Sequence, residues 1–425
     1  MLEQQKKPTF LVENNDFGRK FSNRVFAITN ASKQLFEDID VWDKLESYVK
    51  WVDGMYVWSE YYRNSVHFKS ADPLEGEPAC TIIENERMLR AIHEKLESIP
   101  KTKEQIQYET AVINIKQFKT NNEDQQSPVI HLNILNKNQG IERNISTRLL
   151  VGCDGFKSLV RSKSTLPYYE YEIPQMGIVG TVQIDSPFVD NSVAFQRFVS
   201  DKLVIALLPL DENHSSFVLS VRKEDYKSWM DKSDEEFVYE FNRALVNENR
   251  PNPMNRVASN SVRMSKLPTI ISLIPDSRAA YPLGFGTTIP KLVGTIQTNC
   301  FYTRDFMKKY DFFNTVIIGD AAHRIHPLAG QGLNLGLGDV QELGQSLEEN
   351  LKRGFDLFDT RIDSCEALSN CLYQFERARL LKLLPMMGAI STMQTLMSYT
   401  PPALLSLLDS SQWLKSQIVN FANSR

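Results

Sequence analysis

The chain has 425 residues, of which 42% are hydrophobic and 24% are charged, and its formal net charge is −4. This length can bury one large or two ordinary cores, and the composition is typical of a folded globular protein. Charges of one sign form no long block, which argues against a nucleic-acid partner and favours a small-molecule ligand. The five cysteines show no CxxC spacing, so we expect a reducing compartment and no metal site. No stretch reaches the roughly 18 consecutive apolar residues of a membrane span.

The first predicted element is a short buried strand within PTFLVENN, residues 8–15, ending at Glu13. A carboxylate at a strand end suits hydrogen bonding to an adenosine ribose, as in dinucleotide-binding folds. In those folds a GxGxxG turn precedes the acid by roughly 20 residues. Only twelve residues precede Glu13, and none of the 19 glycines forms GxGxxG. We therefore expect the sequence as given to lack the first strand and its phosphate-binding turn.

The next elements alternate between strands and one helix. Residues 42–80 are rich in aromatic side chains and predict strands and turns. Residues 84–99 place Met88 and Ile92 on one apolar face and predict an amphipathic helix. The alternating segments that follow it predict a small meander of strands.

A second block rich in strands covers residues 171–222, with DENHSS as a turn. A helix is predicted over residues 233–248, where Ser233 and Glu236 have the spacing of a capping box. Beyond about residue 279 the pattern predicts strand and loop up to the motif at residues 315–338, and helices after that motif to the end. The segregated strands suggest a cofactor domain built from separate segments, with a sheet domain inserted between them.

Two motifs concentrate the chemistry. In TVIIGDAAHRIHPLAGQGLNLGLG, residues 315–338, a buried strand ends at Asp320 and a turn leads into a helix, as at a nucleotide crevice. In LLVGCDGFKSLVR, residues 149–161, another apolar strand ends near Asp154. Its glycines allow close approach of a ligand, and Asp154 with Arg161 suits hydroxyl and phosphate groups. The second motif alone indicates only an Asp-Gly turn, but both together favour a cofactor site.

At these motifs the chain resembles the class A flavin-dependent aromatic hydroxylases, which are para-hydroxybenzoate hydroxylase-like proteins with GxGxxG, DG and GD signatures. Within them it is most similar to the mitochondrial ubiquinone-biosynthesis hydroxylases. The resemblance covers nearly the whole chain and rests on five segments: SNRVFAIT (22–29), AFQRF with IALLPL (194–210), SRAAYPLGFG (277–286), GDAAHRIHPLAGQGLNLGLGDVQEL (319–343) and FERARL (375–380).

The resemblance implies an α/β fold with an N-terminally truncated, Rossmann-like FAD-binding domain, an inserted mixed β-sheet substrate domain and C-terminal helices. It implies these domain bounds: 1–41, 81–163 and 290–352 for the FAD-binding domain, 42–80 and 164–289 for the substrate domain, and 353–425 for the helical region.

The resemblance also implies residue roles toward FAD. Asp320 would accept hydrogen bonds from the ribitol hydroxyls, and the helix that begins near Gly332 would direct its positive end at the flavin pyrimidine. Arg24 is either close to the cofactor phosphates or a solvated surface residue. Asn85 is either a flavin contact or a helix N-cap. The full expected cofactor set is Glu13, Arg24, Asn85, Asp154, Asp320, Pro327, Gly330, Gln331, Gly332, Leu333 and Asn334.

Several nearby residues are expected to have structural roles. Gly336 and Gly338 each cost a helix roughly 1 kcal/mol relative to alanine, so close backbone packing is their expected reason. His323 and His326 lack ligand spacing and are expected to make structural hydrogen bonds. The expected core residues of this helix are Leu335, Leu337, Val340, Leu343 and Leu347. Three residues of the inserted sheet either face substrate or form its core: Phe195, Arg197 and Leu208.

The implied activity is insertion of one atom of dioxygen into the aromatic ring of a polyprenylated ubiquinone precursor, at ring position five. No catalytic dyad is expected. The electron donor stays open between a nicotinamide and a ferredoxin-type protein. Partners would be subunits of a ubiquinone-biosynthesis complex, with peripheral contact to the matrix side of the mitochondrial inner membrane. The alternative is a non-catalytic scaffold or lipid-binding member of that complex, which has lost full FAD binding.

Overall fold

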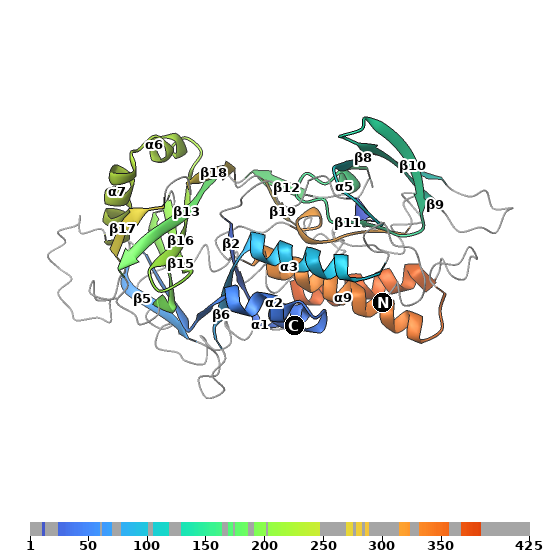
Figure 1. The fold of residues 1–425 in the computed structure, drawn as a ribbon, viewed down its shortest axis with the longest axis horizontal. Coiled ribbons are helices and arrows are strands. Elements are labelled where there is room, and N and C mark those ends of the chain that lie inside the picture. The colour runs from blue at the N-terminus through green and yellow to red at the C-terminus, as the bar shows by residue number, and fades with distance from the viewer. Residues whose placement is uncertain are drawn as a thin grey trace, which may run out of the picture.

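The computed structural model describes sixteen segments of the chain: residues 11–12, 24–59, 62–69, 78–100, 105–118, 129–163, 169–172, 175–185, 191–200, 203–246, 269–274, 278–282, 285–288, 314–323, 331–356 and 367–383. Figure 1 shows a large sheet with two helices at one end, long helices across the middle and a small meander at the other end. This mixture of helices and strands confirms the predicted α/β class.

Eight of the described strands form the large sheet. They are β4 (Gly54–Ser59), β5 (Tyr62–Lys69), β13 (Gln175–Asp185), β14 (Val193–Ser200), β15 (Leu203–Pro209), β16 (His214–Arg222), β17 (Thr269–Leu273) and β18 (Ala279–Pro282). The order is β17-β13-β16-β15-β14-β4-β5, with β18 also paired to β13. β14 runs parallel to β4 and antiparallel to β15. The alternating pattern of the sequence predicted β14, β15 and β16, and these strands are confirmed.

Helices cover the face of this sheet that is turned away from the rest of the molecule (Figure 1). They are α6 (Tyr226–Met230) and α7 (Asp234–Val246). The ring of Phe217 from β16 lies 5.2 Å from that of Phe237 and 5.4 Å from that of Phe241, both on α7. The capping box is confirmed, because Ser233 and Glu236 exchange two hydrogen bonds of 3.2 Å between side chain and backbone amide.

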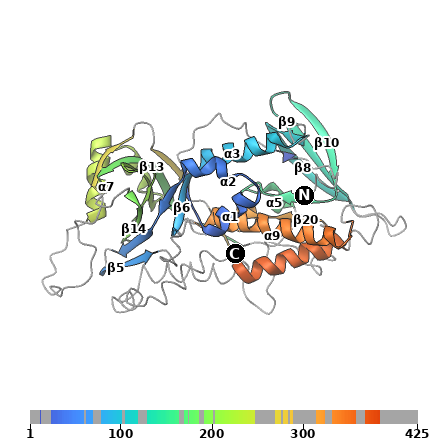
Figure 2. The ribbon, with the colours of Figure 1, turned by 60° about the horizontal axis from the view of Figure 1, so that its bottom comes forward.

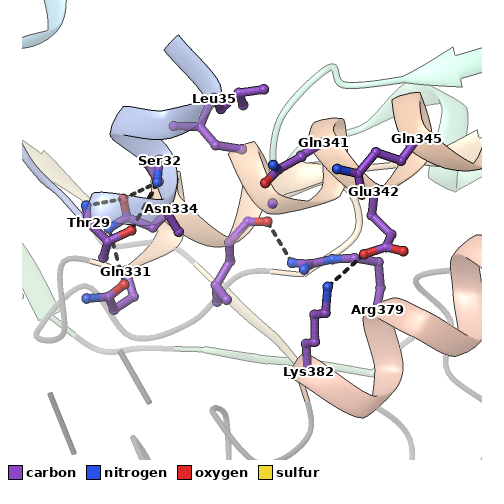
Figure 3. Close-up of a pocket in the computed structure, with 14 residues that line it drawn as sticks. Thr29, Ser32, Leu35, Gln331, Asn334, Gln341, Glu342, Gln345, Arg379 and Lys382 are labelled. Carbon is purple, nitrogen blue, oxygen red and sulfur yellow. Dashed lines mark hydrogen bonds and ion pairs between the residues drawn. The ribbon is translucent and has the colours of Figure 1, made fainter. Parts of the chain in front are cut away.

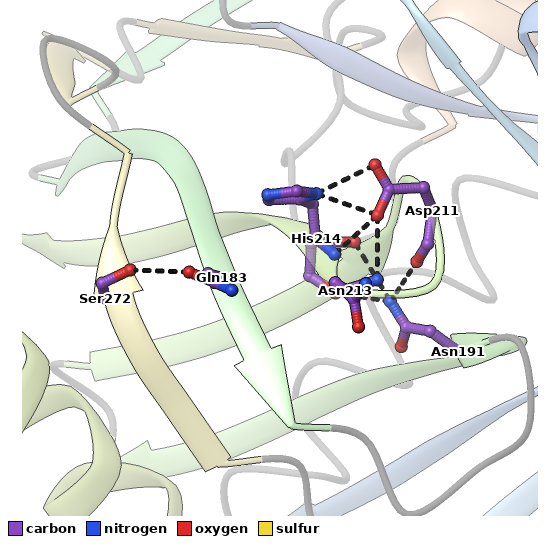
Figure 4. Close-up of polar contacts among 7 residues, drawn as sticks. Gln183, Asn191, Asp211, Asn213, His214 and Ser272 are labelled. Atoms are coloured by element: carbon purple, nitrogen blue, oxygen red, sulfur yellow. Dashed lines mark hydrogen bonds and ion pairs between the residues drawn. The ribbon is translucent and has the colours of Figure 1, made fainter.

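The predicted turn between β15 and β16 is held by polar contacts (Figure 4). The Asp211 carboxylate accepts hydrogen bonds from the backbone amides of Asn213 and His214 at 2.9 and 2.8 Å, and it contacts Nδ1 of His214 at 2.9 Å. The side-chain amide of Asn191 donates to the carbonyls of Asp211 and His214. An Asp that accepts from the amides two and three positions later is a common turn device, which explains the sharp reversal here.

A smaller antiparallel sheet, of order β2-β6-β3, lies beside the other face of the large sheet. Its strands are β2 (Val25–Ile28), β3 (Lys50–Val52) and β6 (Cys80–Glu84). The associated helices are α1 (Asn30–Asp38), α2 (Trp42–Leu45), η1 (Glu46–Tyr48) and α3 (Asn85–Ser98). The predicted amphipathic helix is α3, and Met88 is among its buried residues.

The prediction of strands and turns throughout residues 42–80 is wrong at its beginning. Trp42 and Leu45 are buried on α2 and pack with Phe36 of α1 and Met88 of α3. Their spacing of three residues puts both on one side of a single helical turn, a pattern too short to separate from a strand by periodicity. Residues 42–52 therefore pack with helices of the expected FAD-binding domain. The expected boundary between that domain and the substrate domain lies before them, at residue 42.

The remaining strands join segments from both halves of the sequence. The predicted meander is confirmed as an antiparallel sheet, of order β10-β9-β8. Its strands are β8 (Thr110–Phe118), β9 (Val129–Asn136) and β10 (Ile141–Thr147). Three two-stranded pairs are β1 (Leu11–Val12) with β7 (Ile106–Gln107), β11 (Leu150–Gly152) with β20 (Thr315–Ile317), and β12 (Tyr169–Glu172) with β19 (Phe285–Thr288).

The long helix α9 (Gly332–Lys352) crosses the middle of the molecule, and the helix over residues 367–383 lies alongside it (Figure 2). Both contribute to one apolar core together with β9 and β20. Leu335, Leu343 and Leu347 are buried there as expected. Leu337 is partly buried against another apolar cluster, which contains Phe36, Trp42 and Met88. Val340 is 47% exposed, so its predicted core position is wrong. It follows buried Asp339 and is rotated from it by about 100° around the helix. No described helix is both long enough and apolar enough to cross a membrane.

Candidate cofactor site

The two sequence motifs lie side by side, because the strands that precede them pair directly. β11 and β20 are parallel, with Leu150 opposite Thr315 and Gly152 opposite Ile317. The amide of Ile318 extends the pairing by donating to the carbonyl of Gly152 at 3.0 Å. Parallel strands end at the same edge of a sheet, so the turns bearing Asp154 and Asp320 emerge at one crevice, where α/β folds bind their ligands.

Gly152 has a packing role, and its close approach to a ligand stays a prediction. A Cβ atom at this position would lie 2.8 Å from Cβ of Val160 and 3.0 Å from Cγ2 of Ile317. Val160 belongs to the short helix α5 (Leu159–Lys163), which packs onto the strand end. Gly155 has a φ of +77°, a conformation for which glycine is favoured, and its Cβ position is open.

Asp154 is bound within its own turn. Its carboxylate accepts hydrogen bonds from the hydroxyl of Ser158 at 2.5 Å and from the amides of Leu159 and Val160 at 2.7 and 3.1 Å. These bonds satisfy amides at the start of α5, which have no partner within the helix. Contact between Asp154 and FAD stays a prediction.

Asp320 differs from Asp154, because its carboxylate is exposed and accepts no hydrogen bond from any residue that the structure describes. It lies in the short helical turn η4 (Gly319–Ala321), directly after β20. A Cβ atom on Gly332 would lie 3.9 Å from its Oδ1 atom, so the carboxylate lies beside the first turn of α9. Gln331, the N-cap of α9, makes no side-chain capping bond, and the first turn has no acidic residue.

This arrangement fits the groups of FAD that the motif implies. A free carboxylate accepts hydrogen bonds from hydroxyl groups, as on a ribitol chain. The uncapped start of a 21-residue helix offers backbone amides and a partial positive charge of roughly half an elementary charge to an electron-rich ring edge. Gly332 leaves room for a ligand to approach these amides.

Asn334 anchors the start of α9 to β2 and α1, and Figure 3 shows its contacts with Thr29 and Ser32. Its Oδ1 atom accepts from the amide of Thr29 at 3.1 Å and from the hydroxyl of Ser32 at 2.8 Å. Its Nδ2 atom donates to the carbonyl of Ala27 at 2.9 Å and to Oε1 of Gln331 at 3.2 Å. Two donated and two accepted bonds use the full capacity of an amide side chain. Its effect on a cofactor site is therefore to place the helix start.

The close packing expected for Gly336 and Gly338 is confirmed. A Cβ atom on Gly336 would lie 3.3 Å from Cα of Gly319, in the turn that precedes Asp320. A Cβ atom on Gly338 would lie 3.0 Å from both terminal nitrogens of Arg379, on the neighbouring helix. The structural role expected for His323 is also supported, since its Nε2 atom contacts Oδ2 of buried Asp339 at 2.6 Å.

Comparison with known proteins gives the family. The family described as FAD binding domain matches residues 24–264 and 293–375, which is more than half of the chain. The chain belongs to this FAD-binding family. The mitochondrial ubiquinone biosynthesis monooxygenase COQ6 of Drosophila melanogaster is 30% identical over 402 residues, covering 91% of this chain and 76% of that protein. The same-named protein of Danio rerio is 29% identical over 424 residues, covering 95% and 80%.

Solved structures show the same fold. The p-nitrophenol 4-monooxygenase PnpA of Pseudomonas putida has a TM-score of 0.63 at 15% identity, covering all of this chain and 94% of its own. HpxO of Klebsiella pneumoniae, solved with FAD, has a TM-score of 0.61 at 14% identity, covering 99% and 92%. The fold expected from the resemblance is therefore confirmed, and FAD is the cofactor of this family.

The other expected FAD residues lie in two places. Arg24 and Asn85 are neighbours, since the backbone amide of Asn85 donates to the carbonyl of Arg24 at 2.9 Å. Glu84 is the N-cap of α3, so the alternative of Asn85 as that N-cap is wrong. The side chain of Leu333 is partly buried against the apolar cluster that contains Phe36, Trp42 and Met88. Three expected residues lie outside the described residues: Glu13, Pro327 and Gly330.

Two of the three residues weighed as substrate contacts are core or structural residues. Phe195 is 2% exposed and belongs to the core under α7. Arg197 is buried, and its guanidinium donates to the carbonyls of Ala244 and Leu245 at the end of α7. Leu208 points to the opposite face, where it packs near Ala194. The alternation along β14 and β15 predicts that Phe195 and Arg197 share one face of the sheet and that Leu208 lies on the other. It does not predict which of the two faces α7 covers.

The role of Arg161 differs from the one its sequence motif predicts. It was expected to contact phosphate, but it is 3% exposed and donates to the carbonyls of Ala321 at 2.7 Å and Phe156 at 2.5 Å. Arg161 therefore ties the Asp154 turn to the Asp320 turn. Its helical spacing after the DG turn was visible in the sequence, but its backbone partners were not.

Proposed function

We propose that this chain is an FAD-dependent monooxygenase that hydroxylates the aromatic ring of a polyprenylated ubiquinone precursor, at ring position five. The proposal rests on the exposed carboxylate of Asp320, which has no hydrogen-bond partner among the described residues and lies beside the start of α9. A scaffold needs only packing residues at this place. An exposed carboxylate at a crevice gives no packing energy, so its use lies in binding a ligand.

The family membership and the similarity to proteins named ubiquinone biosynthesis monooxygenase support the reaction. FAD, when bound, supplies the activation of dioxygen. The protein would hold the ribitol through Asp320, orient the ring system at the start of α9, and exclude water from the reacting ring. Arg24, Asn85, Asp154, Gln331, Gly332 and Leu333 are proposed to complete the cofactor site, with Asn334 holding the helix in place.

We also propose the setting of this reaction from the relatives. The enzyme would act in mitochondria, at the matrix side of the inner membrane as a peripheral protein, with other ubiquinone-biosynthesis subunits. The relatives' name includes the word mitochondrial, which supports the compartment. The electron donor is a nicotinamide or a ferredoxin-type protein, and the substrate is an electron-rich phenol with a polyprenyl tail.

Flavin binding and ring oxidation test the proposal in sequence. The purified protein, incubated with FAD and desalted, should retain flavin absorbance, and Asp320→Asn should reduce retention. The flavin-loaded protein should then add one oxygen atom to a short-chain polyprenyl phenol, seen by mass spectrometry, with the ring position assigned by NMR. Supplying either NADPH or a reduced ferredoxin identifies the donor. A protein that takes up no flavin would refute the enzyme and favour a scaffold.

A further inference from the structure

A buried carboxylate lies directly behind the turn that bears Asp320. Asp339 on α9 is completely buried, and its two oxygens have different partners. Oδ2 accepts from the backbone amide of Gly319 at 2.8 Å and from Nε2 of His323 at 2.6 Å. Oδ1 accepts from Nε of Arg379 at 2.7 Å. One side chain thus joins the turn after β20, the long helix α9 and the helix over residues 367–383.

Arg379 compensates the charge of Asp339 and is itself fixed. It is 4% exposed, and its Nη2 atom donates to the carbonyl of Leu335 at 3.0 Å (Figure 3). Its guanidinium fills the space that a side chain at Gly338 would occupy. A buried carboxylate without such a cation would be very costly, so the pair is a single unit that keeps an anion behind the turn.

The contacts of this unit are made on both sides of Asp320. Gly319, the residue before it, has a φ of +60° and donates its amide to Asp339. His323, three residues after Asp320, is 2% exposed and must donate from Nε2, because an ionised carboxylate only accepts. Arg161 donates a further hydrogen bond to this turn, at the carbonyl of Ala321. Within this turn, Asp320 is the residue whose side chain is left exposed.

We propose that Asp339 is a positioning residue of the cofactor site, which fixes the turn at Gly319 and His323 so that the Asp320 carboxylate stays beside the first turn of α9. This inference rests on the proposed function, since it assumes that Asp320 holds FAD. It also gives the FERARL segment a role, because Arg379 in that segment supports the Asp320 turn through Asp339. The Asp339 carboxylate would therefore affect FAD affinity without contacting the cofactor.

A double-mutant cycle on FAD affinity separates positioning from simple stabilisation. The dissociation constant for FAD is measured by flavin fluorescence with the wild type, Asp339→Asn, Asp320→Asn and the double variant, well below their unfolding temperatures. We expect Asp339→Asn to weaken binding about tenfold or more, the scale of one lost charged hydrogen bond. In the Asp320→Asn background the same change should have little further effect, because the two residues act through one contact.

Glu342→Gln is the matched control. It removes the exposed ion pair of Glu342 with Lys382, which at 2.8 Å joins the same two helices without contacting the turn. FAD affinity should remain at the wild-type value. If Asp339→Asn does not fold, His323→Leu enters the same cycle, since it removes one contact to the turn and leaves Asp339 paired with Arg379.

The outcomes distinguish this inference from the proposed function. A wild type that binds no FAD would overturn the proposed function itself. A wild type that binds FAD, with equal losses for Asp339→Asn in both backgrounds, would overturn positioning alone, because a purely structural residue gives additive effects. Positioning is also overturned if Asp339→Asn, or His323→Leu in its place, leaves FAD affinity unchanged.

Discussion

Replacing Asn334 with alanine should destabilise the protein strongly, because this amide is the main polar link between α9 and the β2–α1 segment. The alanine would leave the amide of Thr29 and the carbonyl of Ala27 without their partner. Thr29 is 5% exposed, so water does not readily replace the lost bond. Each buried group left unpaired costs about 1–3 kcal/mol, so the two groups together give a loss of about 2–6 kcal/mol in the free energy of unfolding. Ser32 loses less, since its hydroxyl keeps a contact with Thr29 at 3.3 Å.

Urea unfolding followed by tryptophan fluorescence and circular dichroism measures this loss. Trp42 and Trp51 lie in the cluster that α1 and the start of α9 share, so their emission reports on this region. Gln331→Ala is the control, because it removes only the 3.2 Å bond to Asn334 and should cost less than about 1 kcal/mol. An Asn334→Ala variant no less stable than this control would refute the view that the amide anchors the helix.

Two further predictions concern the same helices. Gly338→Ala should destabilise the protein by about 1–3 kcal/mol, because the added methyl group displaces the guanidinium of Arg379. Gly344→Ala should stabilise α9 by about 0.5–1 kcal/mol, because its methyl group meets open space. Opposite shifts in melting temperature would check both predictions. Burial acts to raise the pKa of Asp339, but His323, Arg379 and the Gly319 amide lower it below its ordinary value. Its ionised form therefore adds stability above the unfolded pKa of about 3.9, and this contribution falls as pH drops toward the folded pKa. Asp339→Asn should lack this part of the acid dependence of the melting temperature, and an unchanged profile would contradict the assignment.

Much of the fold could be predicted because local patterns specify local elements. Alternation predicted β14, β15 and β16, and the Ser233 capping box predicted the start of α7. The four residues of α2 could not be predicted in this way, since one turn does not show a helical period. Exposed Val340 shows a second limit, because a helix in contact with several elements has no single apolar stripe from which its solvent side can be read.

The candidate site could be predicted in its chemistry but not in its connections. The Gly-Asp motif identified Asp320, and the helical glycines correctly implied close packing. The pairing of β11 with β20 joins residues more than 160 positions apart, and no periodicity specifies such a partner. The partners of Asp339 were hidden for the same reason, since Gly319, His323 and Arg379 meet only after the helices pack.

The two motif aspartates show how the following residues decide how many acceptor positions of a strand-end carboxylate are left for a ligand. Asp154 is followed after four residues by a hydroxyl and then by the free amides of α5, which together occupy its oxygens. Asp320 is followed by two alanines, which offer no side-chain donor, and the next described helix begins at Gly332. The amides two and three positions after Asp320, those of Ala322 and His323, instead donate to the carbonyl of Gly319 at 2.8 and 2.9 Å. An aspartate after each of two adjacent parallel strands thus caps a helix in one turn and leaves an exposed acceptor in the other.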